Sequence, residues 1–291
     1  MKGAIIVNGY FMNEATTYQA ERLVSEFNKL GAEISVIKSN EIITSIKDGK
    51  ACVNHKLLDG VSFVIYLNKD RYQAELLELA GYKLFNSYEA IVNCDDKMLT
   101  FVKLANQGVN MPYTISSPIM YSENDDKAFL DSVESSLGYP IIVKNVYGSM
   151  GRTVYKADNR NELDKLFVSL RMTPHIYQQA IKPLGEDTRV IVVGGKVVGA
   201  IKRSSKTDFR SNVELGGTAS AVTITDDVKN LCEKVAKILD LDYAGIDVLS
   251  DGKTNYICEV NSNAFFSGME KATGINIAYA YAKCVLNKVN G

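Results

Sequence analysis

Short apolar runs alternate with amphipathic stretches over the first ninety or so residues, and this alternation limits the fold more than any other feature. The runs Ala4–Val7, Ile34–Ile37 and Phe63–Leu67 predict β-strands. Residues 14–30 carry apolar side chains at helical spacing, and a second helix is predicted around Glu75–Ala80. Strands that alternate with helices imply a parallel sheet covered on both faces.

The regular alternation stops near residue 95, where we place a domain boundary. Two acidic residues open a helix predicted over Asp95–Asn106, as the helix dipole favours. The rest of the chain predicts mixed α+β structure. The predicted elements are a helix at 126–137, strands at Tyr113–Ile115, Ile141–Asn145, Thr153–Lys156 and Ile176–Ala180, a hairpin of Val190–Val193 and Val197–Lys202, a helix at 226–240, strands at 243–249 and 255–261, and a helix from Ile275.

Composition and charge exclude several classes of function. The formal net charge is −1, whereas a general binder of nucleic acid or acidic membranes needs a basic excess. No apolar run approaches the roughly 18 residues of a membrane span. The five cysteines are scattered, and the two histidines, His55 and His175, are far apart. We therefore expect a cytoplasmic enzyme without a disulfide framework, a histidine-based zinc site or a Ser-His-Asp triad.

Two predicted strands near the C-terminus carry polar residues in apolar surroundings. Glu259 and Asn261 are two residues apart, so their side chains point to the same face of one strand. Asp247 lies on the preceding strand, and the length of the intervening loop decides whether it shares that face. Three such oxygen ligands would suit Mg²⁺, although a solvated polar face is the alternative. The apolar flanks favour a site, because buried acids need a compensating partner.

A glycine-rich loop and two lysines are candidates for phosphate binding. Small residues in Tyr147–Arg152 would let backbone N–H groups approach phosphate oxygens. The loop matches neither the P-loop nor the dinucleotide pattern, and on its own a glycine hairpin turn explains it better. Lys144 is the single charge in an apolar strand beside this loop. Lys97, near a helix start, is on its own better explained as an exposed helix lysine.

Three arginines gather around the predicted hairpin. Arg189 opens it, Arg203 ends it, and Arg210 follows in the next loop. Beside a metal and phosphate site, arginines would stabilise a phosphoryl group during transfer. An exposed charged loop is the alternative, and it accounts for Lys206 and Asp208.

Taken together and in this order, these segments resemble the ATP-grasp superfamily, in particular its RimK-like carboxylate–amine ligases. The resemblance covers roughly residues 86–280. Each segment is short, but their joint order and spacing is specific. They are Asn86-Ser87, Asp96-Lys97 with Thr100, Pro140–Lys144, Gly148–Arg152, Gly185–Arg189, Asp208–Asn212, Gly245–Asp247, Glu259–Asn261 and Gly268–Gly274.

The resemblance implies an ATP-grasp fold of α/β and α+β character. Residues 1–94 would form a parallel α/β pre-grasp domain, and residues 95–291 the ATP-grasp domain. Within the latter, a lid-type subdomain would span about 112–180 and a metal-binding subdomain about 181–291. ATP would lie between these two subdomains.

The resemblance also implies a chemistry, with ATP and two Mg²⁺ ions as cofactors and Mn²⁺ as a substitute. A carboxylate would take the γ-phosphoryl group, and an amine would then displace phosphate to form an amide. Arg189, Arg203 and Arg210 match catalytic positions, and Asp247, Glu259 and Asn261 match the metal ligands. The positions that match nucleotide-binding residues are Lys97, Lys144, Gly148, Ser149, Met150, Gly151, Gln178, Gln179, Ala180, Ile181, Asp187 and Asn212.

Two departures from the family pattern bear on specificity. Gln179 stands where the adenine-reading strand usually has an acidic residue, which weakens the prediction of nucleotide preference. After Glu259–Asn261, relatives commonly run through a Ser-Pro-Gly-Leu turn, whereas this chain has Ser262–Ser267 with two phenylalanines and no proline. A relative's substrate therefore cannot be transferred across this turn.

Two other functions compete with an amide-forming ligase. A phosphotransferase could use the same nucleotide site without forming an amide, and a non-catalytic module could bind nucleotide only. The presence of all candidate lysines and metal residues argues against the second. We expect a carboxylate substrate and an amine or amino acid, with no nucleic acid and no membrane partner; a homo-oligomer stays open.

Overall fold

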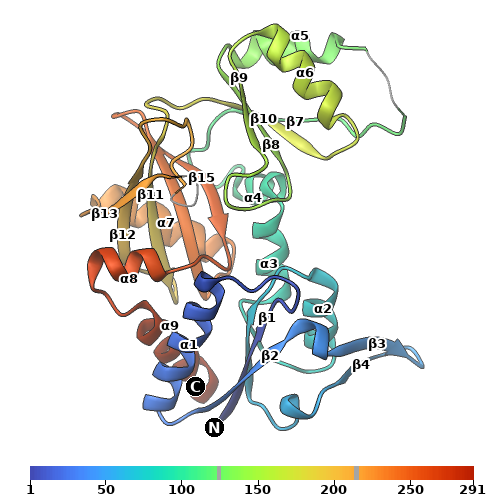
Figure 1. The fold of residues 1–291 in the computed structure, drawn as a ribbon, viewed down its shortest axis with the longest axis vertical. Coiled ribbons are helices and arrows are strands. Elements are labelled where there is room, and N and C mark those ends of the chain that lie inside the picture. The colour runs from blue at the N-terminus through green and yellow to red at the C-terminus, as the bar shows by residue number, and fades with distance from the viewer. Residues whose placement is uncertain (123–125, 213–215) are drawn as a thin grey trace.

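The computed structural model describes residues 1–122, 126–212 and 216–291, and its three larger sheets follow one another along the chain (Figure 1). The mixed α/β and α+β class predicted above is confirmed. Within the described residues, no helix is long and apolar enough to cross a membrane.

The N-terminal sheet is parallel, in the order β2-β1-β5-β6. Its strands are buried apolar runs, and the helix that follows β1 packs Leu23 and Phe27 into the core. A hairpin that the sequence analysis missed projects from this region (Figure 1). The elements are β1 (Lys2–Val7), α1 (Glu14–Lys29), β2 (Glu33–Lys38), η1 (Ser39–Glu41), the hairpin strands β3 (Ile43–Lys47) and β4 (Lys50–Asn54), η2 (Lys56–Leu58), β5 (Phe63–Leu67), α2 (Arg71–Leu79) and β6 (Leu84–Phe85).

Two short helices replace the single helix predicted over Asp95–Asn106. They are α3 (Tyr88–Asp95) and α4 (Lys97–Leu104). Asp96 lies between them in an extended conformation, and its carboxylate accepts a hydrogen bond from the Leu99 amide at 3.0 Å. The prediction was wrong because Asp96 caps the start of α4 instead of continuing a helix.

The second sheet is antiparallel, in the order β7-β10-β8-β9, with α5 and α6 packed on it at the top of Figure 1. Its predicted strands are present within a residue or so of their expected bounds. Helix α6 was not predicted, and the first residues of the helix predicted at 126–137 precede the start of α5. The elements are β7 (Thr114–Ser116), α5 (Ala128–Leu137), β8 (Ile141–Asn145), β9 (Val154–Ala157), α6 (Arg160–Leu170) and β10 (His175–Gln179).

The third sheet is antiparallel and five-stranded, in the order β13-β12-β11-β14-β15. One face packs on α7, whereas the other packs on α8, α9 and the N-terminal core. The predicted hairpin and the last two strands are present, and α8 was missed. The elements are β11 (Glu186–Val193), β12 (Lys196–Ser204), β13 (Thr218–Ala221), α7 (Asp226–Ile238), β14 (Tyr243–Ser250), β15 (Asn255–Asn261), α8 (Ser267–Thr273) and α9 (Ile277–Asn290).

A polar cluster ties α1 to α8 and α9. Glu270 accepts hydrogen bonds from the Tyr18 hydroxyl at 2.7 Å and the Arg22 guanidinium at 3.0 Å. Arg22 also pairs with Glu26 at 2.9 Å and donates to the Asn276 side chain at 2.8 Å. The cluster fixes the N-terminal sheet against the C-terminal helices.

Asn86 connects the same parts of the chain from within the core. Its Nδ2 donates to the carbonyl oxygens of Tyr243 and Ser262, both at 2.8 Å. Its Oδ1 accepts from the amides of Asp242 at 2.6 Å and Tyr243 at 3.1 Å. One buried side chain therefore holds the start of β14 and the exit of β15 in place.

We expect Asn86→Ala to lower the free energy of unfolding by about 3 kcal/mol, because it leaves buried backbone groups without partners. Urea unfolding checks this. The control is Asn159, an exposed residue that caps helix α6. Asn159→Ala should lower the free energy of unfolding by only about 1 kcal/mol. Equal losses in the two variants would contradict the role given to Asn86.

Glu26 should make the fold sensitive to acid. Burial raises the pKa of its carboxyl, but hydrogen bonds from Lys29, Asn276 and Arg22 lower it from 4.5 to about 2. Because the folded pKa lies below the ordinary one, the contribution of Glu26 to stability is full above pH 4.5 and is lost as the pH falls toward 2. In Glu26→Gln, urea midpoints should fall less steeply across this window, whereas exposed Glu21→Gln should follow the parent protein.

Candidate functional site

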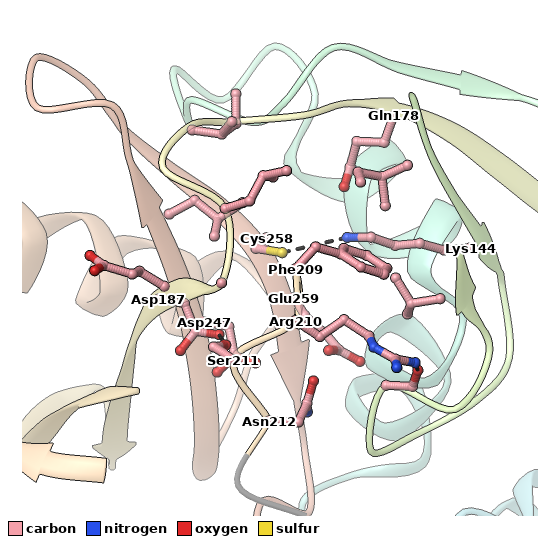
Figure 2. Close-up of a pocket in the computed structure, with 18 of the residues that line it drawn as sticks. Lys144, Gln178, Asp187, Phe209, Arg210, Ser211, Asn212, Asp247, Cys258 and Glu259 are labelled. Carbon is pink, nitrogen blue, oxygen red and sulfur yellow. Dashed lines mark hydrogen bonds between the residues drawn. The ribbon is translucent and has the colours of Figure 1, made fainter. Parts of the chain in front are cut away.

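A cavity lies between the second and third sheets, and most of the residues predicted to bind nucleotide line it. This first cavity encloses about 740 Å³, including open solvent at its mouth. Lys144 and Gln178 enter from β8 and β10, whereas Asp247, Cys258 and Glu259 lie on the β14–β15 side (Figure 2). The other predicted residues on its lining are Lys97, Gly151, Gln179, Ile181, Asp187, Arg203, Arg210 and Asn212.

Both predicted phosphate lysines are buried. Lys97 is 6% exposed and Lys144 is 7% exposed. Lys97 starts α4, donates to the Gly148 carbonyl at 2.9 Å and lies 3.4 Å from a Glu259 carboxylate oxygen. The interpretation of Lys97 as an ordinary exposed helix lysine is therefore wrong. Lys144 lies 3.5 Å from the Cys258 sulfur and points across the cavity toward it (Figure 2).

The glycine loop keeps a tight shape that larger residues would break. Gly148 has φ of 148°, and a Cβ placed there would lie 2.1 Å from the Thr153 hydroxyl oxygen. Met150 has a positive φ of 58° without being glycine. Ser149 and Met150 line a second cavity instead of the first. The loop thus runs between the two cavities.

The strand predicted to read adenine follows the wall of the first cavity. In β10, Gln178 pairs with Ile142 and Gln179 with Ile141. Gln178 is buried, and its amide donates to the Thr114 hydroxyl at 2.9 Å. Ala180 follows Gln179 in the chain and precedes the lining residue Ile181. The backbone at this end of β10 is therefore beside the cavity.

Two buried charged residues, Arg203 and Asp247, and two half-buried ones, Asp187 and Arg189, form the floor of the site. Both carboxylate oxygens of Asp247 accept bonds from Arg189, each at 2.7 Å. Arg203 donates hydrogen bonds to both acids. Its Nη2 lies 2.9 Å from an Asp247 oxygen and also binds Asp187 Oδ2, and its Nε lies 2.7 Å from Asp187 Oδ1. Asp187 also accepts a bond from the Ser211 hydroxyl at 2.6 Å. This ion network of Asp187, Arg189, Arg203 and Asp247 joins β11, β12 and β14.

The network keeps Asp247 ionised. Burial alone would raise the pKa of its carboxyl, but the charges and hydrogen bonds of Arg189 and Arg203 lower it to about 2. The same acids hold the pKa of both arginines above the ordinary range despite burial. At neutral pH Asp247 is therefore an anion held between two guanidinium cations.

A bulge in β15 decides the arrangement of the predicted metal ligands. Asp247 pairs directly with Glu259, while Val248 pairs with Ile257, so Cys258 is the extra residue. Directly opposed residues share a face of a sheet, which answers the question that the loop length left open. Burial raises the pKa of the Cys258 thiol, which disfavours its thiolate form.

The donor set is compatible with Mg²⁺. No group of three or more His, Cys, Asp or Glu side chains gathers within residues 1–122, 126–212 and 216–291. The predicted set instead combines two carboxylates, on the paired residues Asp247 and Glu259, with the amide oxygen of Asn261. Among the described residues, the buried Asn261 Nδ2 has no hydrogen-bond partner, so the amide is not held by a bond of its nitrogen. Asp247 would exchange arginine bonds for metal bonds, because both its oxygens are engaged.

A second cavity of about 930 Å³, with open solvent included, adjoins the first. Glu259 and Asn212 line both cavities. Arg189 and Asn261 line the second. It also takes residues from the N-terminal region that the sequence analysis missed, namely Asn8, Phe11, Thr16, Asn68 and Lys69. Their signal in the sequence was their place after the strands of a parallel sheet, where ligands commonly bind.

The first cavity also has lining residues that were not predicted. Phe209 lies beside Lys144 (Figure 2), and Arg210 donates to the Gly151 carbonyl at 2.7 Å, which joins the loop 208–212 to the glycine loop. Only the apolar position of Phe209 within a charged loop could have signalled it.

Comparison with known proteins places these features in a family. Beta-citrylglutamate synthase B of Danio rerio is 37% identical over 217 residues, which are 72% of this chain and 52% of that protein. Ribosomal protein bS6–L-glutamate ligase of Escherichia coli O9:H4 is 37% identical over 205 residues, 69% of this chain and 66% of the ligase. The chain thus spans about half to two thirds of the length of these curated relatives.

Solved structures share the whole fold at low identity. The ATP-grasp ligase PsnB, complexed with minimal precursor, Mg and ADP, aligns with a TM-score of 0.72 at 17% identity, covering 99% of this chain and 98% of that one. D-alanine–D-alanine ligase from Bacillus anthracis aligns with a TM-score of 0.73 at 17% identity, covering 100% and 97%. The model of the RimK-like ATP-grasp domain matches residues 94–285. The chain therefore belongs to the RimK-like ATP-grasp family.

Proposed function

We propose that this protein is an ATP- and Mg²⁺-dependent ligase that activates a carboxylate and joins it to an amine. The supporting observation is that Glu259 and Asn212 line both cavities. A nucleotide in the first cavity would meet a second substrate at these residues. Such adjacency suits group transfer, because it holds both reactants at one point.

Most of the predicted residues have a role in this proposal. Lys97 and Lys144 bind phosphate oxygens, and the glycine loop covers them. The β10 end, with Gln178 and Ile181, accommodates the base. Asp187 was predicted to contact the nucleotide. In this proposal it acts indirectly, by holding Arg203 in place through their hydrogen bond. Arg189 faces the second cavity, where it would stabilise charge on the transferred phosphate or the carboxylate.

Magnesium, as two ions with Mn²⁺ as a substitute, would be held by Asp247, Glu259 and Asn261 and would neutralise phosphate charge. A carboxylate oxygen of the acid attacks the γ-phosphorus, and the bond to ADP breaks. The amine nitrogen then attacks the resulting acyl carbon, and phosphate leaves with its bonding electron pair. The amine loses a proton, and an amide remains.

The relatives bear on the substrates and on the setting. Their names include glutamate ligases and synthases, which supports an amino acid or peptide amine as one substrate. We assign residues 1–94 to a pre-grasp domain, 112–180 to a lid and 181–291 to the metal-binding subdomain, and we place the protein in the cytoplasm.

Incubation with Mg-ATP, amino acids and small carboxylates should yield ADP, free phosphate and a product whose mass equals acid plus amine minus water. Mass spectrometry and a phosphate-release assay measure these together. A product heavier by a phosphoryl group, with no free phosphate, would instead establish a phosphotransferase. Nucleotide binding without any product from a broad panel would favour a binding module.

Glu259→Gln should lower the rate of ATP turnover by about a hundredfold or more, because it removes a charge between the two cavities. The thermal midpoint should be nearly unchanged, since the side chain is partly exposed. Glu89→Gln is the matched control, because Glu89 also pairs with a lysine, Lys103, but on the surface. Full activity in Glu259→Gln would remove Glu259 from the reaction centre.

A further inference from the structure

The second cavity lies at the point of the N-terminal sheet where the strand order reverses, between β1 and β5. Strand β1 stands between β2 and β5, so the chain proceeds to one side of β1 and then to the other. Asn8 follows β1 and Asn68 follows β5, and the two amides are joined by a hydrogen bond of 3.0 Å. A crevice at the carboxyl ends of such strands is a common ligand position in α/β sheets.

Every charged residue on the described lining of this cavity already has an ionic partner. Lys69 pairs with Asp95 at 2.7 Å, and Glu259 lies 3.4 Å from Lys97. Arg189 pairs with Asp247 within the ion network. Arg189 can serve one carboxylate, which in this inference is the α-carboxylate of the amino substrate. Lys69 is the remaining cation on this lining, and Asp95 neutralises it.

The uncharged lining is mostly amide and apolar, with two hydroxyl residues, Thr16 and Ser149. Five asparagines contribute, together with two phenylalanines, a leucine and a methionine. They are Asn8, Asn68, Asn212, Asn261 and Asn263, and Phe11, Phe265, Leu67 and Met150. Amides can bind the polar backbone of a ligand, whereas the apolar set would cover an apolar side chain. A second carboxylate here would lose its hydration without gaining a free cation, which is costly.

The loop beside this cavity carries three consecutive exposed apolar residues. Tyr10 is 87% exposed, Phe11 47% and Met12 43%. Phe11 itself lines the cavity. An exposed apolar run of this length is unfavourable unless it has a function. It extends the apolar lining outward from the cavity.

We propose that the second cavity selects an uncharged amino acid with an aromatic or long aliphatic side chain as the amino substrate, and that the Lys69–Asp95 pair excludes acidic amino acids. The proposal rests on the ligase function proposed above and specifies its amine. In it, the substrate amine points to Glu259, the side chain packs among Phe11, Phe265 and Met150, and Lys69 stays bound to Asp95.

Isothermal titration of the full chain with Mg²⁺ and AMPPNP present tests this selection. The probes are L-phenylalanine, L-glutamine and L-glutamate, of which the last two differ by one charge. Phenylalanine should bind at least about tenfold more tightly than glutamate, with glutamine between them. Glutamate binding as tightly as phenylalanine, or no binding by any of the three, would overturn the proposal.

Two substitutions separate the charge from the apolar lining. Asp95→Asn leaves Lys69 without its anion, so glutamate should bind about tenfold more tightly while phenylalanine is unaffected. Phe265→Ala should weaken phenylalanine about tenfold and leave glutamate unchanged. Asp158→Asn is the matched control, because Asp158 pairs with Lys156 at 2.7 Å away from the cavity lining. An Asp95→Asn variant with parental glutamate affinity would refute the role of the pair.

Titration of the protein with AMPPNP in the presence of Mg²⁺ distinguishes failure of this inference from failure of the proposed ligase function. If AMPPNP does not bind with Mg²⁺, the proposed ligase function fails. If AMPPNP binds and glutamate is preferred, the ligase function stands and only the selection fails. Amide formation from phenylalanine in the product assay would support both.

Discussion

The rest of this site depends on four charged side chains that neutralise one another, two of them buried and two half-buried. Asp187, Arg189, Arg203 and Asp247 alternate in sign across β11, β12 and β14. Any one of them alone would be costly to bury, and removal of one partner leaves an uncompensated charge. Through the Ser211 hydroxyl, the same network fixes the loop that carries Arg210. The floor of the first cavity and one of its walls therefore depend on a single electrostatic unit.

The sequence predicted the fold best where burial follows a short local pattern. β5, β8 and β15 have the expected bounds because their apolar runs end at polar or turn residues. The hairpin β3–β4 was missed because its residues are largely exposed and carry no clear apolar alternation. Helix α6 was missed although Leu163 and Phe167 are buried, because charged residues make up most of its first half. The break at Asp96 depends on a single capping bond.

For the site, sequence order predicted which residues would gather, but not what each would touch. The face shared by Asp247 and Glu259 depends on a bulge that no loop count reveals. Burial of Lys97 arises from its contact with a loop fifty-one residues away, and helix periodicity contains no such information. The N-terminal lining of the second cavity was missed because the strand ends that form it lie far apart in the sequence, and their place after parallel strands was the sole signal noted for them. Contact of each residue with ATP, metal or substrate stays a prediction.

The bond between Arg210 and the Gly151 carbonyl is a mechanical link across the first cavity. Both residues line that cavity, one from the loop 208–212 and the other from the glycine loop. Any movement that separates these two loops must break this bond first. Because the acceptor is a main-chain oxygen, substitution of Arg210 removes the bond, whereas a new side chain at position 151 leaves the acceptor atom in the chain.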